Sequence, residues 1–193
     1  WANPLPGGVH ADLCCGSGDL TLLVARTLRG QGNIIGIDFS SQQLAIAQSR
    51  GQASPWAKSL AWIEADVLNL PLEDSSVDSL TMGYGLRNVA SIEQALAEMF
   101  RILKPQGRAA ILDFNRVETP WARQFQQWYL RQIVVPVATY FHLKEEYAYL
   151  ETSLARFPTG PEQVALAKAA GFASATHYPI AGGMMGVLVM VKP

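Results

Sequence analysis

A pair of closely spaced glycines and two aspartates carry the most specific chemistry in this sequence. Gly16 and Gly18 follow a short apolar run, and a helical pattern begins directly after them. Glycine permits a sharp turn close to a ligand, and the free N–H groups of a following helix attract carboxylate or phosphate. Asp38 ends the next apolar run, where it can accept hydrogen bonds from both hydroxyls of a ribose. The pattern predicts a nucleotide-binding βαβ unit; the alternative is a glycine turn that serves packing alone.

The residues around this turn favour S-adenosylmethionine (SAM) over a dinucleotide. The dinucleotide fingerprint closes with a third glycine or alanine, and Thr21 stands at that position. Asp12 lies four residues before Gly16. A carboxylate there disfavours a pyrophosphate and suits the α-ammonium group of SAM. We therefore expect Asp12, the Gly16–Gly18 turn and Asp38 to bind SAM, with Phe39 as a further contact.

The elements that position these residues alternate between apolar runs and helical patterns. This order is typical of a parallel sheet with right-handed crossovers. We expect strands at residues 9–12, 33–38, 60–66, 77–82 and 108–114. Two final strands, 173–180 and 185–191, have no helix between them and must be antiparallel neighbours. A dehydrogenase-type sheet would continue with another helix, so the closing hairpin favours the methyltransferase variant of the fold.

Asp66 and Val67 follow the third predicted strand as Asp38 follows the second. Both residues are expected beside the crevice where an adenine would lie, because ligands of such sheets bind outside the carboxyl ends of the strands. The carboxylate of Asp66 can accept a hydrogen bond from the adenine amino group. The alternative is an ordinary loop carboxylate.

The regular alternation ends after Phe114. Nine of the eighteen aromatic residues lie between Arg116 and Gly160, and Pro136 divides this segment into two helical pieces. We expect a lid at about residues 116–160 that suits an apolar, ring-shaped substrate. The alternative is that these aromatic side chains pack on the edge of the sheet.

Composition narrows the class of protein further. A chain of 193 residues with 49% hydrophobic content suits one α/β domain, 1–193, with a substantial core. The net charge of −1 gives no electrostatic footprint for nucleic acid, and no apolar run approaches the length of a membrane span. The adjacent Cys14 and Cys15 do not make a zinc site and are expected to be small packing residues, so no metal is predicted.

Several segments together resemble one enzyme family. They are the opening at 14–20, the loop 83–89 with Leu-Arg-Asn-Val at its end, residues 103–108, Phe157-Pro158 and the Gly182-Gly183 turn. The chain resembles the menaquinone/ubiquinone biosynthesis C-methyltransferases over essentially its whole length. It is most similar to the demethylphylloquinone methyltransferase branch of cyanobacteria and plastids.

The resemblance implies a class I SAM-dependent methyltransferase fold, a Rossmann-like seven-stranded sheet of order 3-2-1-4-5-7-6 with the last strand antiparallel. It also implies that Ser17 contacts the methionine portion of SAM and that Gly83 lies on the sulfonium side. The family carries an N-terminal helical segment before the first strand, of which only the end, Trp1–Pro4, is expected here.

The implied reaction is C-methylation of a prenylated naphthoquinol, from 2-phytyl-1,4-naphthoquinol to phylloquinol or from demethylmenaquinol to menaquinol. The alternatives are methylation of a benzoquinol, an NAD-dependent oxidoreductase and a non-enzymatic SAM-binding module. Because the quinol must lose a proton with a pKa of about 10, we expect Arg87 to stabilise the naphtholate. His142, Glu145 or Glu146 would accept the proton.

The same substrate implies a location. A prenylated quinol is confined to the bilayer, so we expect peripheral contact with a thylakoid, plasma or plastid membrane from the cytoplasmic side. A homodimer is also possible on this reading.

Overall fold

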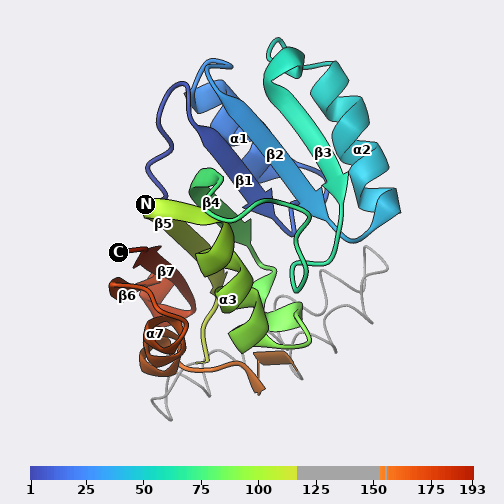
Figure 1. The fold of residues 1–193 in the computed structure, drawn as a ribbon. Helices are drawn as coiled ribbons and strands as arrows, with labels where there is room; N and C mark the ends of the chain where they lie inside the picture. Colours follow the sequence, from blue (N-terminus) through green and yellow to red (C-terminus); the bar gives the residue numbers. More distant parts are fainter. Residues whose placement is uncertain (117–152, 155) are drawn as a thin grey trace, which may run out of the picture.

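The structure is a computed structural model that describes residues 1–116, 153–154 and 156–193. In these ranges seven strands form one sheet in the order β3-β2-β1-β4-β5-β7-β6, as predicted (Figure 1). Strand β7 is antiparallel to both of its neighbours, and the other pairs are parallel. The strands are β1 Val9–Leu13, β2 Asn33–Asp38, β3 Leu60–Glu64, β4 Val77–Gly83, β5 Leu103–Phe114, β6 Ser174–Ile180 and β7 Met185–Val191.

Helices cover both faces of the sheet. The described helices are α1 Asp19–Thr27, α2 Ser41–Gln52, α3 Ile92–Ile102 and α7 Gly160–Ala169, with short 3-10 turns η1 Ala57–Ser59, η2 Leu86–Asn88 and η4 Ala181–Gly183. In Figure 1 α1 lies behind the sheet and α3 in front of it. α1 and α3 lie on opposite faces because the strands are added in opposite directions from β1. Right-handed crossovers lead through β2 and β3 on one side and through β4 on the other. β1 and β4 are parallel neighbours, and successive strands are added to the sheet on opposite sides of this pair, which opens a crevice at their carboxyl ends.

A tryptophan on β3 explains the glycines on the α1–α2 face of the sheet. A Cβ on Gly18, Gly36 or Gly51 would lie 2.8, 2.5 or 3.0 Å from the indole of Trp62. These glycines come from the turn before α1, from β2 and from α2. The indole therefore packs directly on backbone and fixes the glycine-rich turn against the sheet.

The start of one strand differs from the predicted position. Strand β5 begins at Leu103 and not at Arg108, since Leu103 already pairs with Val77 of β4, and the register shifts before Arg108 pairs with Ser79. On α1 the buried side chains include Thr21, while Leu23 is 53% exposed. Helix α7 begins with a capping box of Thr159 and Glu162. Within the described ranges, no helix has the length and apolar character needed to cross a membrane.

Candidate functional site: a cofactor cavity at the switch point of the sheet

A cavity of about 400 Å³ opens where β1, β2 and β4 end. Its wall comes from four successive connections: the turn after β1, the loops after β2 and β3, and the segment that follows β4. The lining residues are Leu13, Cys14, Ile37, Asp38, Phe39, Ala65, Asp66, Val67, Leu68, Tyr84, Gly85, Asn88, Val89 and Ala90. This is the position at which open α/β sheets bind ligands.

Asp38 is held in this wall by main-chain donors. Its Oδ2 accepts a hydrogen bond from the N–H of Gly16 at 2.7 Å, and its Oδ1 accepts from Ser40 N at 2.9 Å. Each carboxylate oxygen can accept a second hydrogen bond. The carboxylate is therefore fixed in orientation and can still accept further hydrogen bonds, so its contact with the ribose hydroxyls stays a prediction.

The hydrogen bonds of the glycine turn argue against a dinucleotide. The Gly16 N–H is bound by Asp38, and the Gly18 N–H donates to the carbonyl of Cys15 at 2.9 Å. In a dinucleotide site the backbone of this turn approaches the pyrophosphate. Here the two N–H groups are already bound, and a pyrophosphate would approach the carboxylate of Asp38.

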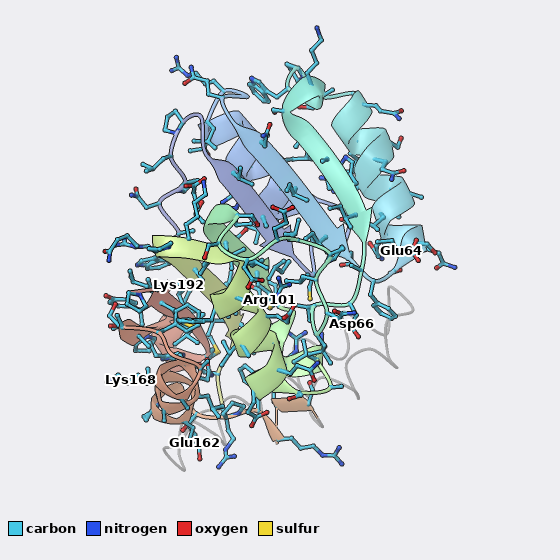
Figure 2. The ribbon with its side chains drawn as sticks, in the orientation of Figure 1. Glu64, Asp66, Arg101, Glu162, Lys168 and Lys192 are labelled. Carbon is cyan, nitrogen blue, oxygen red and sulfur yellow. The ribbon has the colours of Figure 1, made fainter. Side chains whose placement is uncertain are left out.

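Asp66 and Val67 take the places expected of an adenine contact. Both line the cavity, and Figure 2 shows Asp66 beyond the carboxyl end of β3. The N–H of Leu68 donates to Oδ1 of Asp66 at 3.0 Å, which leaves Oδ2 oriented by the loop. Val67 is buried and offers an apolar surface to a flat ring.

Asp12 lies elsewhere than the sequence suggested. It is fully buried, and its two oxygens accept from the hydroxyls of Thr21 and Thr81, each at 2.7 Å. It is absent from the cavity wall. Burial raises its pKa to about 6, against the lowering effect of the threonine hydrogen bonds. A direct contact with the ammonium group of a ligand is therefore not available to it, because burial and both hydroxyls close it off.

The remaining predicted cofactor residues differ in their relation to the cavity. Phe39 lines it and is 78% exposed, so its ring is free to cover a ligand. Ser17 lies at the outer side of the turn, where its carbonyl accepts from Arg50 at 2.7 Å. Gly16 and Gly18 shape the turn without lining the cavity, and Gly83 packs on α1, where a Cβ would lie 2.9 Å from Leu20.

Cys14 is a wall residue that sequence reasoning assigned to packing. Cys14 has a left-handed φ of 52°. It packs so closely on Gly85 that a Cβ added to Gly85 would lie 2.6 Å from the Cβ of Cys14. Burial and the surrounding carboxylates raise the pKa of its thiol to about 12. The thiol thus stays protonated and gives the cavity a neutral, soft surface. Its place two residues before Gly16 is the signal that could have identified it.

Arg87 forms an ion pair with Asp113 at the edge of the cavity. Its Nη1 donates to Oδ1 of Asp113 at 2.6 Å and to the carbonyl of Tyr84 at 3.0 Å. The guanidinium also lies over the rings of Tyr84 and Phe114. Burial raises the pKa of Asp113, and Arg87 opposes that shift. The sequence signal for this pair is the acid inside the apolar run 109–114.

The other predicted catalytic residues, His142, Glu145 and Glu146, lie outside the described residues, as does most of the predicted lid. A second cavity of about 520 Å³ adjoins the first and shares Asn88, Val89 and Ala90 with it. Arg87 contributes to its wall. Among the described residues, no group of histidine, cysteine and acidic side chains could hold a metal ion.

The sheet order, the closing antiparallel strand and a cavity with carboxylates after β2 and β3 define a class I SAM-dependent methyltransferase. The sequence model of the ubiE/COQ5 methyltransferase family matches residues 2–192, and the chain belongs to this family. The chain therefore is a methyltransferase that uses SAM, as the sequence predicted.

Named relatives are similar over the whole chain. A 2-phytyl-1,4-naphtoquinone methyltransferase of Nostoc punctiforme is 55% identical over 192 residues, which are 100% of this chain and 84% of that protein. The chloroplastic 2-phytyl-1,4-beta-naphthoquinone methyltransferase of Arabidopsis thaliana is 45% identical over 194 residues, or 100% and 74%. A SAM-dependent methyltransferase structure from Aquifex aeolicus shares the fold, with a TM-score of 0.70 at 16% identity over 97% of this chain and 84% of that one.

Proposed function

We propose that this chain transfers the methyl group of SAM to a ring carbon of a reduced 2-phytyl-1,4-naphthoquinone. The observation that carries this proposal is the identity of 45–55% over the entire chain to relatives named for that substrate. The alternative acceptors are demethylmenaquinol and a benzoquinol.

SAM supplies an electrophilic methyl group, so the chain has to bind and orient two substrates and help one proton leave. The new C–C bond forms from the electron pair of the ring, the S–CH₃ bond breaks with its pair left on sulfur, and the ring carbon loses its proton. Residues on this path must favour the ionised quinol and hold the ring in line with the methyl group.

Arg87 supports this step as a donor of hydrogen bonds. Its charge is balanced by Asp113, so the pair presents little net charge to a sulfonium nearby. The pair is nearly buried, with side-chain exposures of 13% and 4%, which strengthens a hydrogen bond to a naphtholate oxygen. We propose His142, Glu145 or Glu146 as the group that accepts the proton.

The second cavity supports a location for the acceptor. It borders the SAM cavity along Asn88–Ala90, and Arg87 is in its wall. A quinol ring at this border would lie between a cofactor held by Asp38 and the guanidinium of Arg87. The geometry thus suits transfer between two adjoining spaces.

The phytyl chain of the proposed acceptor favours peripheral contact with a membrane. We propose that the aromatic-rich segment at about 116–160 provides the docking face, since the chain's net charge of −1 gives little attraction to anionic lipids. Flotation with liposomes that carry the embedded quinone tests this. Protein that stays at the bottom of the gradient contradicts the membrane proposal and leaves the methyl transfer proposal intact. The possible homodimer stays a prediction.

The substrate is tested by methyl transfer from labelled SAM to a panel of chemically reduced quinones. We expect the highest kcat/KM with 2-phytyl-1,4-naphthoquinol, a lower value with demethylmenaquinol and the lowest with a benzoquinol. An oxidised quinone serves as the control, because it lacks the electron density that attacks the methyl group. A preference for the benzoquinol would overturn the proposal.

A further inference from the structure

A buried chain of polar side chains runs beneath the cofactor cavity. It begins in the sheet at Ser79 and His10 and ends at the start of α1. His10 Nδ1 lies 2.8 Å from Ser79 Oγ, and its Nε2 lies 3.1 Å from Thr81 Oγ1. Thr81 Oγ1 donates to Asp12 at 2.7 Å, and Thr21 donates to the other oxygen of Asp12. None of these side chains lines the cofactor cavity.

The end of this chain replaces a missing helix cap. The N-cap residue of α1 is Gly18, which has no side chain to bind the free N–H groups of the first turn. Asp12 fills that role from β1, because its carboxylate accepts from both the backbone N–H and the hydroxyl of Thr21. A carboxylate at this end of a helix is also favoured by the helix dipole. Asp12 thus fixes where α1 begins, and with it the turn that leads into α1.

Counting hydrogens gives His10 a defined role in the chain. Thr81 has one hydroxyl hydrogen and donates it to Asp12, so toward His10 its oxygen can only accept. His10 must then carry its hydrogen on Nε2. Burial lowers the pKa of His10 to about 4, so the ring is neutral and Nδ1 accepts from Ser79. Each hydrogen has one place, and all of them point toward Asp12.

We propose that His10 is a positioning residue of the SAM site. Through Thr81 it directs the hydroxyl hydrogen that holds Asp12, and Asp12 holds Thr21 in the first turn of α1, which follows the Gly16–Gly18 turn directly. The effect reaches the cavity because Gly16 donates to Asp38, the proposed ribose ligand. The proposal rests on SAM binding alone and is independent of the acceptor.

Two amide substitutions test the roles of Nε2 and Nδ1 of His10 independently. His10→Gln places its amide nitrogen near the position of Nε2 and can still donate to Thr81. His10→Asn reaches only the position of Nδ1 and leaves Thr81 without its donor. We expect the SAM dissociation constant to rise about tenfold in His10→Asn, the upper end of what one hydrogen bond contributes, and to stay within about twofold in His10→Gln.

Matched controls keep packing effects apart from positioning. Ser79→Ala removes the partner of Nδ1 only, and His177→Gln changes a histidine on β6, at the far edge of the sheet. Both are expected to bind SAM as the unchanged protein does. Equal SAM affinity in His10→Asn and His10→Gln, whether both normal or both weakened, would overturn the proposal, since a purely structural role makes no distinction between the two amides.

A spectroscopic measurement on the unchanged protein does not depend on the folding of a variant. The ¹⁵N spectrum of His10 should show a neutral ring with its hydrogen on Nε2, and this N–H signal should shift when SAM is added. His177 serves as the internal reference and should not respond. A hydrogen on Nδ1, or a His10 signal that is unchanged at saturating SAM, contradicts the proposal.

Discussion

Asp113 holds Arg87 at two points. Its Oδ1 accepts from the guanidinium Nη1 at 2.6 Å, and its Oδ2 accepts from the main-chain N–H of Arg87 at 3.1 Å. The carboxylate on β5 therefore fixes both the side chain and the backbone of the η2 turn that follows β4. Position and charge of Arg87 are set by the fold before any acceptor binds.

We predict that Arg87→Lys lowers turnover with the reduced naphthoquinone at least about tenfold, because lysine keeps the charge but loses the planar fork. The SAM dissociation constant should stay nearly constant, which places the loss in the transition state. Single-turnover kinetics and calorimetry measure the two quantities. Turnover near that of the unchanged protein in Arg87→Ala would remove Arg87 from the catalytic step.

The same pair makes a prediction about stability. Arg87→Ala leaves the carboxylate of Asp113 buried without its cation, and we expect the free energy of unfolding to fall by about 3–5 kcal/mol. Asp113→Asn in the same protein should recover part of that loss, because the amide carries no charge. Arg50→Ala is the control: its ion pair with Asp19 is exposed and should contribute less than about 1 kcal/mol. Urea unfolding measures all three.

Asp38→Ala is predicted to weaken SAM binding more than acceptor binding. The loss should be about 1.5–3 kcal/mol, the range for hydrogen bonds to a charged group. The Gly16 N–H also loses its acceptor, so the turn loosens in addition. Glu64→Ala, an exposed acid at the end of the neighbouring strand, is the control (Figure 2). Unchanged SAM affinity by calorimetry would take Asp38 out of the site.

The strands could be predicted because their signals are local, whereas their full order was implied by the resemblance to a methyltransferase family. Buried parallel strands are continuous apolar runs, and a hairpin without a helix at the end of the chain determines the closing pair. Asp38 and Asp66 were placed correctly at the cavity for the same reason: each follows such a run, and the carboxyl ends of neighbouring parallel strands meet at one edge.

Asp12 and Asp113 could not be placed in this way, because their partners are distant in the sequence. Thr81 lies 69 residues from Asp12, and Arg87 lies 26 residues from Asp113. Sequence spacing shows that an acid ends a strand, but which face its side chain takes depends on neighbours from other strands. Thr21 departs from the dinucleotide fingerprint in the sequence, and in the structure its hydroxyl donates to Asp12.

Gly36→Ala is predicted to lower the free energy of unfolding by about 1–3 kcal/mol through overpacking. A Cβ there would lie 2.5 Å from the indole of Trp62, and Gly36 has an ordinary strand backbone, so the effect is steric. Trp62→Leu should make the same substitution nearly neutral. A double-mutant cycle by thermal unfolding measures this coupling; additive effects of the two substitutions would show that the contact is unimportant.

His10 gives the last prediction, which concerns acid stability. Burial lowers the pKa of His10 from 6.5 to about 4, so the unfolded chain binds more protons at this site, and stability is lost as the pH falls through this window. Asp12 acts oppositely: burial raises its pKa from 3.8 to about 6, so its contribution favours folding at low pH and is lost as the pH rises through that range.

The two contributions offset each other in the unchanged protein, and His10→Gln removes only the first. We therefore predict that the stability of His10→Gln relative to the unchanged protein rises as the pH is lowered from 6.5 to 4. The full difference is about 3 kcal/mol, at about 1.4 kcal/mol per pKa unit. Urea unfolding at intervals across this range measures this difference. His177→Gln is the control, and its relative gain should be smaller because His177 is only partly buried. A difference that is independent of pH would show that His10 titrates alike in the folded and unfolded chain, which its burial between Ser79 and Thr81 argues against.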